Sequence, residues 1–280
     1  MIINNLALNN QYSDINRTII IGNFDGVHLG HQSLIKQAVI IAKYHNNSLA
    51  CITFSSHSQH ILNLNATAQY NLFNEQDKYT QLFNNNIEEI FIVNDQSFFQ
   101  LTAKSFVEDI LVKQLLCHNL VVGKDFMFGL SRLGDIYLLL EYERLGYFKL
   151  FIVDTVNDQN NLKISSTNIR HQLANGDIDK ANCLLGYKYY IESQVIVENT
   201  SPLSLGYYNV NIDNIYHPRY GVYIASVEYK KKSYNGVLNI GITPTFLVDK
   251  AKLEMFIFDF TENLYGEIVK IIPKKYLRAE

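Results

Sequence analysis

The sequence of 280 residues contains no tryptophan and only three cysteines, Cys51, Cys117 and Cys183. The cysteines lie far apart and form no C-x-x-C pair, which argues against a zinc site and fits a reducing compartment. Core positions are the default for isolated cysteines of this kind. We therefore expect no metal ligands of the protein's own and a cytoplasmic location.

Long hydrophobic runs and a strong charge imbalance are also absent. No apolar run reaches about 18 residues, the length that suggests a membrane-spanning helix. Residues 1–5 lack the charged start and apolar core of a secretory signal. The net charge of −3, from 24 basic and 27 acidic residues, gives no reason to expect nucleic acid or an anionic membrane as partner. The oligomeric state stays open.

Hydrophobic residues make up 48% of the chain, which predicts a packed globular protein. The first part alternates short apolar runs with helical patterns, whereas strand-like segments with turns follow Tyr187. The alternation predicts an α/β domain with a doubly wound parallel sheet, and the later pattern predicts a smaller all-β barrel. We place the first domain at residues 1–186 and the second at residues 187–280.

The expected elements follow from apolar spacing. In the first domain we expect strands at 17–21, 48–54, 89–93, 119–123 and 149–153. Helices are expected at 32–44, 74–84, 105–117, 134–145, 166–174 and 178–185, the last ending at Gly186. In the second domain we expect strands at 189–198, 221–229, 233–240 and 252–260.

Glycines and histidines concentrate where the first strand leads into the first helix. Residues 22–31 read G-N-F-D-G-V-H-L-G-H. Glycine allows backbone to come close to a ligand, and a helix N-terminus offers unpaired N–H groups to phosphate. His28 and His31 can lie side by side against phosphate oxygens, where a phosphate could keep both protonated. The pattern predicts a polyphosphate-binding turn, and the alternative is a glycine-rich surface turn.

A second segment combines a strand with an aromatic turn. Residues 119–129 read N-L-V-V-G-K-D-F-M-F-G, so that Phe126 and Phe128 fall in the turn. Large apolar side chains are rarely left in a turn unless something covers them. A flavin or adenine ring could do so, and a loop that folds back on its own core is the alternative.

A third segment has the composition of a helix start. Residues 164–170 read I-S-S-T-N-I-R. Ser165 or Ser166 can cap the helix through its hydroxyl. Arg170 lies in the first turns of that helix and can donate two hydrogen bonds to phosphate oxygens. The segment predicts phosphate binding, with a plain serine cap as the alternative.

These segments together resemble one family. Residues 28–31 match the H-x-G-H signature of adenylyl-transferring nucleotidyltransferases, and residues 22–31 resemble the first motif of the prokaryotic bifunctional riboflavin kinase/FMN adenylyltransferase family, also called bacterial FAD synthetase. Residues 121–129 resemble its V-V-G-x-N/D-F-x-F-G motif, and residues 164–170 its I-S-S-T-x-x-R signature. Residues 53–57, T-F-S-S-H, are similar to its T-F-x-P-H, with Ser56 in place of proline.

The resemblance implies that the protein transfers AMP from ATP to FMN, giving FAD and pyrophosphate. The FMN phosphate would attack the α-phosphorus without a covalent enzyme intermediate, so positioning and charge stabilisation are what the site must supply. Mg²⁺ would bridge the ATP phosphates, since it needs few protein ligands. The implied partners are therefore small molecules: ATP, FMN and riboflavin as substrates, and FAD as product.

The resemblance also implies roles for residues of this chain. The implied catalytic residues are His28, His31 and Arg170. The residues implied for ATP and its phosphates are Gly22, Asn23, Phe24, Asp25, Gly30, Ser165, Ser166 and Thr167. Those implied for the nucleotide or the flavin are Phe54, His57, Asp125, Phe126 and Phe128. Many members of the family have asparagine where this chain has Asp125.

The second domain resembles a riboflavin kinase unevenly. Residues 239–246 and 253–266 are similar to the family's N-I-G-x-x-P-T-F and E-x-x-x-x-D-F…L-Y-G. This likeness implies that Glu254 accepts the proton of the ribityl hydroxyl. The family's phosphate-binding G-x-P-T-A-N is replaced by G-Y-Y-N-V-N at residues 206–211, in which only the glycine and Asn211 match.

Further departures follow in the same domain. Asn209 stands where the family has the threonine that binds Mg²⁺ and phosphate, and residues 197–203 contain no glycine or arginine. We also expect the barrel to be truncated, without the family's terminal helix. We therefore expect the kinase activity to be lost. A bifunctional enzyme that also phosphorylates riboflavin is one alternative, and a non-catalytic flavin-binding protein is another; the presence of His28, His31 and Arg170 argues against the latter.

Overall fold

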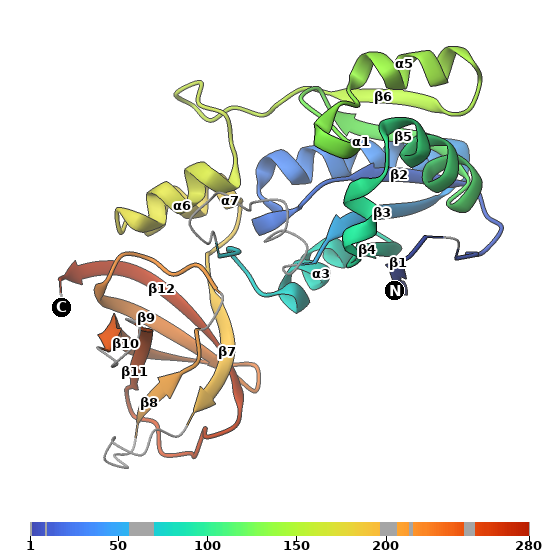
Figure 1. The fold of residues 1–280 in the computed structure, drawn as a ribbon. Helices are drawn as coiled ribbons and strands as arrows, with labels where there is room; N and C mark the ends of the chain where they lie inside the picture. Colours follow the sequence, from blue (N-terminus) through green and yellow to red (C-terminus); the bar gives the residue numbers. More distant parts are fainter. Residues whose placement is uncertain are drawn as a thin grey trace. The chain divides into compact units, whose positions relative to one another are not determined.

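The computed structural model describes residues 2–8, 10–55, 70–196, 206–212, 215–243 and 250–279. It divides the chain into two compact units. One consists of Met1–Gln69 with Lys78–Lys163, and the other of Tyr70–Asp77 with Ile164–Glu280. Figure 1 shows a parallel sheet with helices in the first unit and a barrel in the second.

Six parallel strands form the sheet of the first unit. They are β1 (Ile2–Leu6), β2 (Arg17–Ile21), β3 (Ser48–Phe54), β4 (Glu89–Val93), β5 (Cys117–Gly123) and β6 (Lys149–Val153). Their order is β1-β4-β3-β2-β5-β6. Every residue of β2 and β4 is buried, as is typical of strands with helices on both faces. The order reverses beside β2, and doubly wound sheets bind ligands at the carboxyl end of such a strand.

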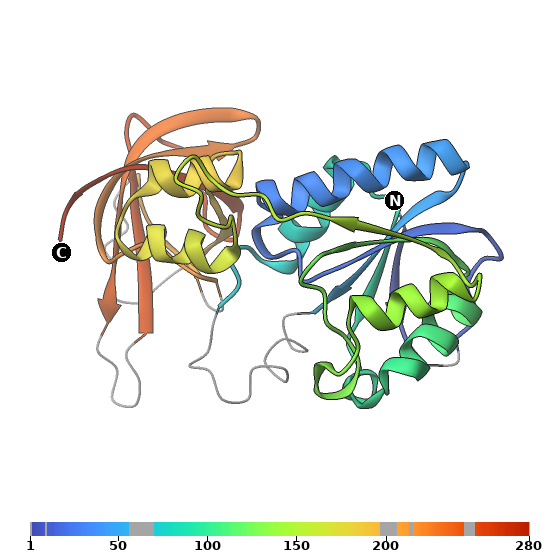
Figure 2. The same cartoon turned by 90° about the horizontal axis from the view of Figure 1, so that it is seen from above.

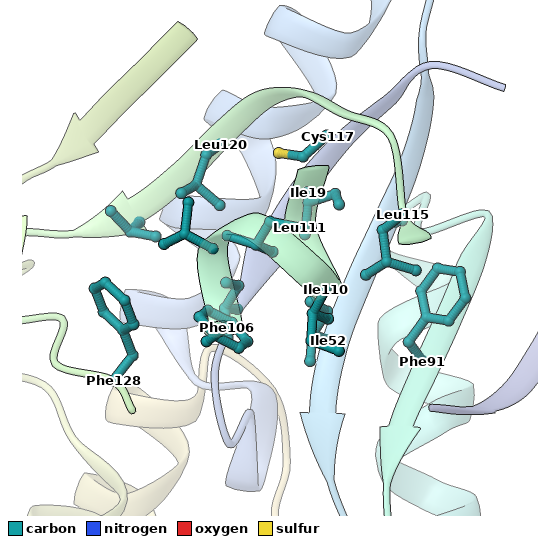
Figure 3. Close-up of a cluster of buried hydrophobic side chains, with 14 of the residues drawn as sticks. Ile19, Ile52, Phe91, Phe106, Ile110, Leu111, Leu115, Cys117, Leu120 and Phe128 are labelled. Atoms are coloured by element: carbon teal, nitrogen blue, oxygen red, sulfur yellow. The ribbon is translucent and has the colours of Figure 1, made fainter. Parts of the chain in front are cut away.

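Helices cover both faces of this sheet (Figure 2). They are α1 (Leu29–His45), α3 (Glu75–Asn84), α4 (Ala103–Ser105), the π-helix η3 (Phe106–Gln114) and α5 (Ile136–Arg144), with short 3₁₀ turns η1 (Asp25–Val27), η2 (Gln96–Gln100) and η4 (Leu130–Arg132). On one face, Leu34 and Ile35 of α1 pack in a core with Ile20 of β2. On the other, Phe106 and Leu111 of η3 face the strands (Figure 3). The α/β fold expected from the sequence is confirmed.

The second unit contains two helices and a closed antiparallel barrel. The helices are α6 (Ser166–Ala174) and α7 (Ile178–Leu185), and Gly186 ends α7 as expected, with φ 80°. The barrel strands are β7 (Ile191–Ile196), β8 (Tyr207–Val210), β9 (Gly221–Tyr229), β10 (Lys232–Thr243), β11 (Lys250–Ile257) and β12 (Ile268–Arg278), in the order β10-β11-β8-β7-β12-β9. The expected barrel is therefore confirmed. Within the described residues, no helix is long and apolar enough to cross a membrane.

Three strands were not expected from the sequence. β1 lies at the edge of the sheet beside β4 and has three exposed residues among its five. β8 has only four residues, and β12 changes register at Pro273. Edge positions, short length and a proline bulge weaken the alternation by which a strand is recognised. The helix expected at 105–117 is present as the π-helix η3, but its expected end was wrong, because Cys117 already begins β5.

Candidate active site

The turn after β2 is fixed by hydrogen bonds to its neighbours. The Gly22 N–H donates to the Ile52 carbonyl at 3.1 Å, and the Thr53 hydroxyl donates to the Asn23 carbonyl at 3.1 Å. Phe24 and Val27 have φ values of 52° and 34°. Such values are unfavourable for bulky and β-branched residues and persist only where the surroundings enforce them. The turn is thus strained and held in one shape.

Packing explains part of the glycine pattern in this turn. A Cβ atom at Gly22 would lie 3.1 Å from the Phe24 ring. Phe24 is fully buried and its ring centre is 5.1 Å from that of His31. Asp25 is also buried, whereas Asn23 is exposed. Among these residues expected to bind ATP, Phe24 and Asp25 therefore shape the turn, while Asn23 is open to a ligand.

His28 and His31 form a stacked pair at the start of α1. Their ring centres are 3.7 Å apart with 16° between the planes. His28 is the N-cap residue of α1, and its Nδ1 accepts a hydrogen bond from the His31 backbone N–H at 3.3 Å. A neutral imidazole that accepts at Nδ1 carries its proton on Nε2. His28 can therefore donate a hydrogen bond through Nε2 to an anion.

Both imidazoles are neutral at physiological pH in this structure. Burial lowers the pKa of His28 to about 4, a backbone hydrogen bond opposes this, and the charge of Lys163 adds to it. Burial also lowers the pKa of His31 well below its usual value, and electrostatic interactions with His28 and Lys78 lower it further. The protonated state expected from the sequence would need a bound phosphate, because a nearby anion favours the charged form.

A cavity of about 460 Å³ opens at the carboxyl ends of β2, β3 and β5. This volume lies in the range of small-molecule sites. The six phenylalanines that line it are Phe54, Phe98, Phe99, Phe106, Phe126 and Phe128. The Phe126 and Phe128 rings are stacked at 5.4 Å and 14°, and those of Phe54 and Phe99 at 5.9 Å and 26°. Flat, roughly parallel rings suit a planar aromatic ligand.

The cavity joins several residues singled out in the sequence. Gly22, Asn23, Phe54, Asp125, Phe126 and Phe128 all line it. Phe128 is nearly buried, so the loop does fold partly onto its own core, as the alternative predicted. Sequence analysis missed Phe98, Phe99 and Phe106. The only signal was the Phe98-Phe99 pair after a strand, which is equally typical of a core.

Asp125 forms an ion pair at the cavity. Its Oδ2 lies 2.5 Å from the Lys163 Nζ, and both side chains are more than half exposed. The hydrogen bond from Lys163 lowers the pKa of Asp125, and the charge of Lys163 contributes further. Lys163 was not expected in the site, although it stands directly before the third motif. The pair offsets the negative charge of Asp125 beside the cavity.

The third motif lies in the second unit. Ser165 caps α6, because its Oγ accepts a hydrogen bond from the Asn168 N–H at 3.3 Å. Ser166 is half-buried and Thr167 exposed in the first turn. The Arg170 Nε donates to the Tyr70 carbonyl at 3.1 Å. The roles of these residues on the same phosphates as His28 stay predictions. His57 lies outside the described residues.

In the barrel, polar residues from three neighbouring strands lie in one row. Glu254 of β11 pairs in register with Asn239 of β10 and Asn209 of β8. The Glu254 carboxylate lies 2.9 Å from the Lys252 Nζ, and it accepts from the Asn239 Nδ2 at 3.5 Å. Burial raises the pKa of Glu254, but hydrogen bonds from Lys252 and Tyr207 outweigh burial and lower it.

Other expected kinase residues are separate or not described. Asn211 is exposed, and its N–H donates to the Gln194 carbonyl at 3.1 Å. Residues 197–203 and 244–246 lie outside the described part of the chain. Among the described residues, no three His, Cys, Asp or Glu side chains are grouped so as to bind a metal ion. Mg²⁺ that arrives with ATP would need few protein ligands, so its involvement stays a prediction.

Comparison with known proteins bears on both units. The FAD synthetase family model matches residues 10–168, and the riboflavin kinase model matches residues 185–280. The chain belongs to the FAD synthetase family. A bifunctional riboflavin kinase/FMN adenylyltransferase of Buchnera aphidicola subsp. Schizaphis graminum is 35% identical over 272 residues, 95% of this chain and 86% of the relative. That of Bacillus subtilis is 34% identical over 267 residues, 93% and 84% of the two chains.

A solved structure shares the fold. A protein from Streptococcus pneumoniae, described as a macrolide-efflux protein, superposes with a TM-score of 0.87 and 26% identity, covering 100% of this chain and 92% of that one. The family models and the two relatives confirm the family suggested by the sequence motifs, and this structure shares the fold along the whole chain.

Proposed function

We propose that this protein transfers AMP from ATP to FMN, giving FAD and pyrophosphate. The observation that carries the proposal is the stacked His28–His31 pair at the start of α1, with Gly22 and Asn23 leading from that turn into the phenylalanine-lined cavity. Neutral imidazoles and a helix N-terminus offer donors to phosphate. The aromatic cavity accepts a planar ring. Together they fit a substrate that combines phosphate with a flavin or adenine.

For this reaction the protein must position the two substrates and stabilise the negative charge that develops on the phosphates. An FMN phosphate oxygen forms a bond to the α-phosphorus of ATP while the bond to pyrophosphate breaks and the electron pair leaves with pyrophosphate. The His28 Nε2–H donates to the phosphate oxygens on which charge gathers, and Arg170 supplies a fixed positive charge. Bound Mg²⁺ would neutralise part of the phosphate charge. A preorganised donor of this kind contributes about 100- to 1,000-fold in rate.

Riboflavin phosphorylation is a second candidate function. It is favoured by the match of the riboflavin kinase model to residues 185–280 and by the position of Glu254 in the polar row of the barrel. Glu254 is ionised at neutral pH and can accept a hydroxyl proton. The opposite expectation is that the kinase activity is lost, because Asn209 stands in place of the family's threonine. This loss stays a prediction.

One experiment tests both activities. The protein is incubated with FMN, ATP and Mg²⁺ and the products are separated by chromatography; riboflavin then replaces FMN in a parallel reaction. We expect FAD from FMN, with none formed without ATP. FAD from riboflavin would establish the kinase step, and its absence would establish the loss of that step. No product from either flavin, with flavin still bound to the protein, would favour the non-catalytic alternative.

A further inference from the structure

Arg170 belongs by sequence to a motif of the adenylyl-transferring part, yet its surroundings are those of the barrel unit. Helix α6 lies in the unit formed by Tyr70–Asp77 and Ile164–Glu280. Tyr216, which precedes β9 of the barrel, contacts Arg170 in two ways. The Tyr216 hydroxyl donates to the Arg170 carbonyl at 3.1 Å, and the Arg170 Cζ lies 5.8 Å from the centre of the Tyr216 ring.

The backbone of Tyr216 is itself fixed in place. Its backbone N–H donates to the Asn71 carbonyl at 2.7 Å, and its carbonyl accepts from the Tyr189 hydroxyl at 2.6 Å. Tyr189 is fully buried. The hydroxyl bond to the Arg170 carbonyl restrains the ring on this backbone. Such a ring can orient a nearby guanidinium, because cations are attracted to an aromatic face within about 6 Å.

The segment Tyr70–Asp77 completes this arrangement. It precedes most of α3 yet folds with the barrel unit. Phe73 packs against Tyr189 and Tyr190, with ring centres 5.6 and 4.9 Å apart, and Asn71 forms a bridge with Ile215. The segment thereby fixes the Tyr70 carbonyl, which accepts the hydrogen bond from the Arg170 Nε. The Arg170 side chain therefore has two contacts in this unit, one with the Tyr70 carbonyl and one with the Tyr216 ring.

We infer that Tyr216 is a positioning residue for adenylyl transfer, because it contacts Arg170 through both its hydroxyl and its ring. The inference rests on the proposed function, since it requires Arg170 to act on the substrate phosphates. A flexible arginine would have to be ordered in each catalytic cycle. Tyr216 keeps it ordered beforehand, and a displacement of about 1 Å in such a group can cost about 100-fold in rate.

The test compares three variants of the full chain. Tyr216→Leu removes the ring and the hydroxyl, and we expect kcat for FAD formation from FMN to fall roughly 10- to 100-fold. Tyr216→Phe keeps the ring and should retain activity within about tenfold, the effect of one lost hydrogen bond. Tyr276→Leu is the matched control, because it removes a similar contact, with Arg219 at 5.2 Å, in the same unit. We expect it to keep wild-type kcat.

A second measurement reports on the surroundings of the Arg170 side chain and does not depend on enzyme activity. The NMR signal of the Arg170 Nε–H, identified by its loss in Arg170→Lys, should move in Tyr216→Leu, because the ring current and the orientation both change. It should stay in place in Tyr276→Leu. Wild-type protein that forms no FAD would refute the proposed function. An active wild type, with unchanged kcat or an unmoved Arg170 signal in Tyr216→Leu, would overturn the inference about Tyr216.

Discussion

Substitution of His28 separates its two roles, the cap of α1 and the donor to phosphate. Nδ1 serves the cap by accepting from the His31 N–H, and Nε2 remains for the substrate. Asparagine is among the best N-cap residues but brings no imidazole, whereas alanine lacks both functions. The asparagine amide ends nearer the backbone than the imidazole Nε2, so His28→Asn should keep the cap and lose the donor at the Nε2 position. His28→Ala should lose both.

The two losses differ in size and in the assay that detects them. Removing the donor should lower kcat for FAD formation by about 100- to 1,000-fold in both variants, which is roughly 3–4 kcal/mol of transition-state stabilisation. Removing the cap costs about 1 kcal/mol in the free energy of unfolding. The melting temperature should therefore fall by about 2–4 °C more in His28→Ala than in His28→Asn.

Measuring kcat and the melting temperature on the same preparations distinguishes the two roles of His28. A His28→Asn variant with wild-type kcat would show that the imidazole takes no part in the reaction. Full activity in His28→Asn together with loss in His28→Ala would assign the residue a purely structural role. Equal melting temperatures of the two variants would refute the reasoning about the cap.

Three further predictions concern pH, the core and the cavity. Burial lowers the pKa of His28 from 6.5 to about 4, so the unfolded chain binds more protons than the folded chain between these pH values. The free energy of unfolding should therefore rise with pH from 4 to 6.5. His28→Asn should flatten this rise, as measured by urea unfolding at each pH. Glu89→Gln leaves the buried Arg17 without its carboxylate at 2.7 Å and should lower the free energy of unfolding by about 3–5 kcal/mol. The exposed pair Lys113–Asp109, at 2.8 Å, provides the control, since Asp109→Asn should cost no more than about 0.5 kcal/mol. Gly134→Ala would place a Cβ 2.7 Å from the Phe128 ring, so we expect it to displace that wall of the cavity and raise KM for FMN; an unchanged KM would remove Phe128 from the flavin site.

The sequence was most informative where burial leaves a continuous apolar pattern. The bounds of β2, β3 and β4 agree with the expected ones to the residue, because most or all of their residues are buried between two helical layers. The bounds of β6 agree as well, although it is an edge strand without a buried residue. The prediction was poorer where position in the sheet decides pairing. β1 and β12 become strands through their neighbours, β4 in one case and β7 and β9 in the other.

The candidate site divides in the same way. Glycine, histidine and serine at fixed spacings identified the turn at 22–31 and a serine cap at Ser165 or Ser166, because these depend on local backbone geometry. The structure assigned the cap to Ser165. The cavity needs Phe98, Phe99 and Phe106, which lie in no motif. These residues could not be distinguished from ordinary core by type or spacing.

The amino-acid sequence by itself determined the family and the two folds, since both depend on short-range pattern and residue type. It also predicted the catalytic residues, and their roles stay predictions. Only the tertiary structure decided that His28 and His31 are neutral, because their pKa values depend on burial and on distant charges. It also decided that Arg170 lies over Tyr216, 46 residues away in the chain. Contacts over such a separation depend on how whole helices and strands pack, so a local sequence pattern does not predict them.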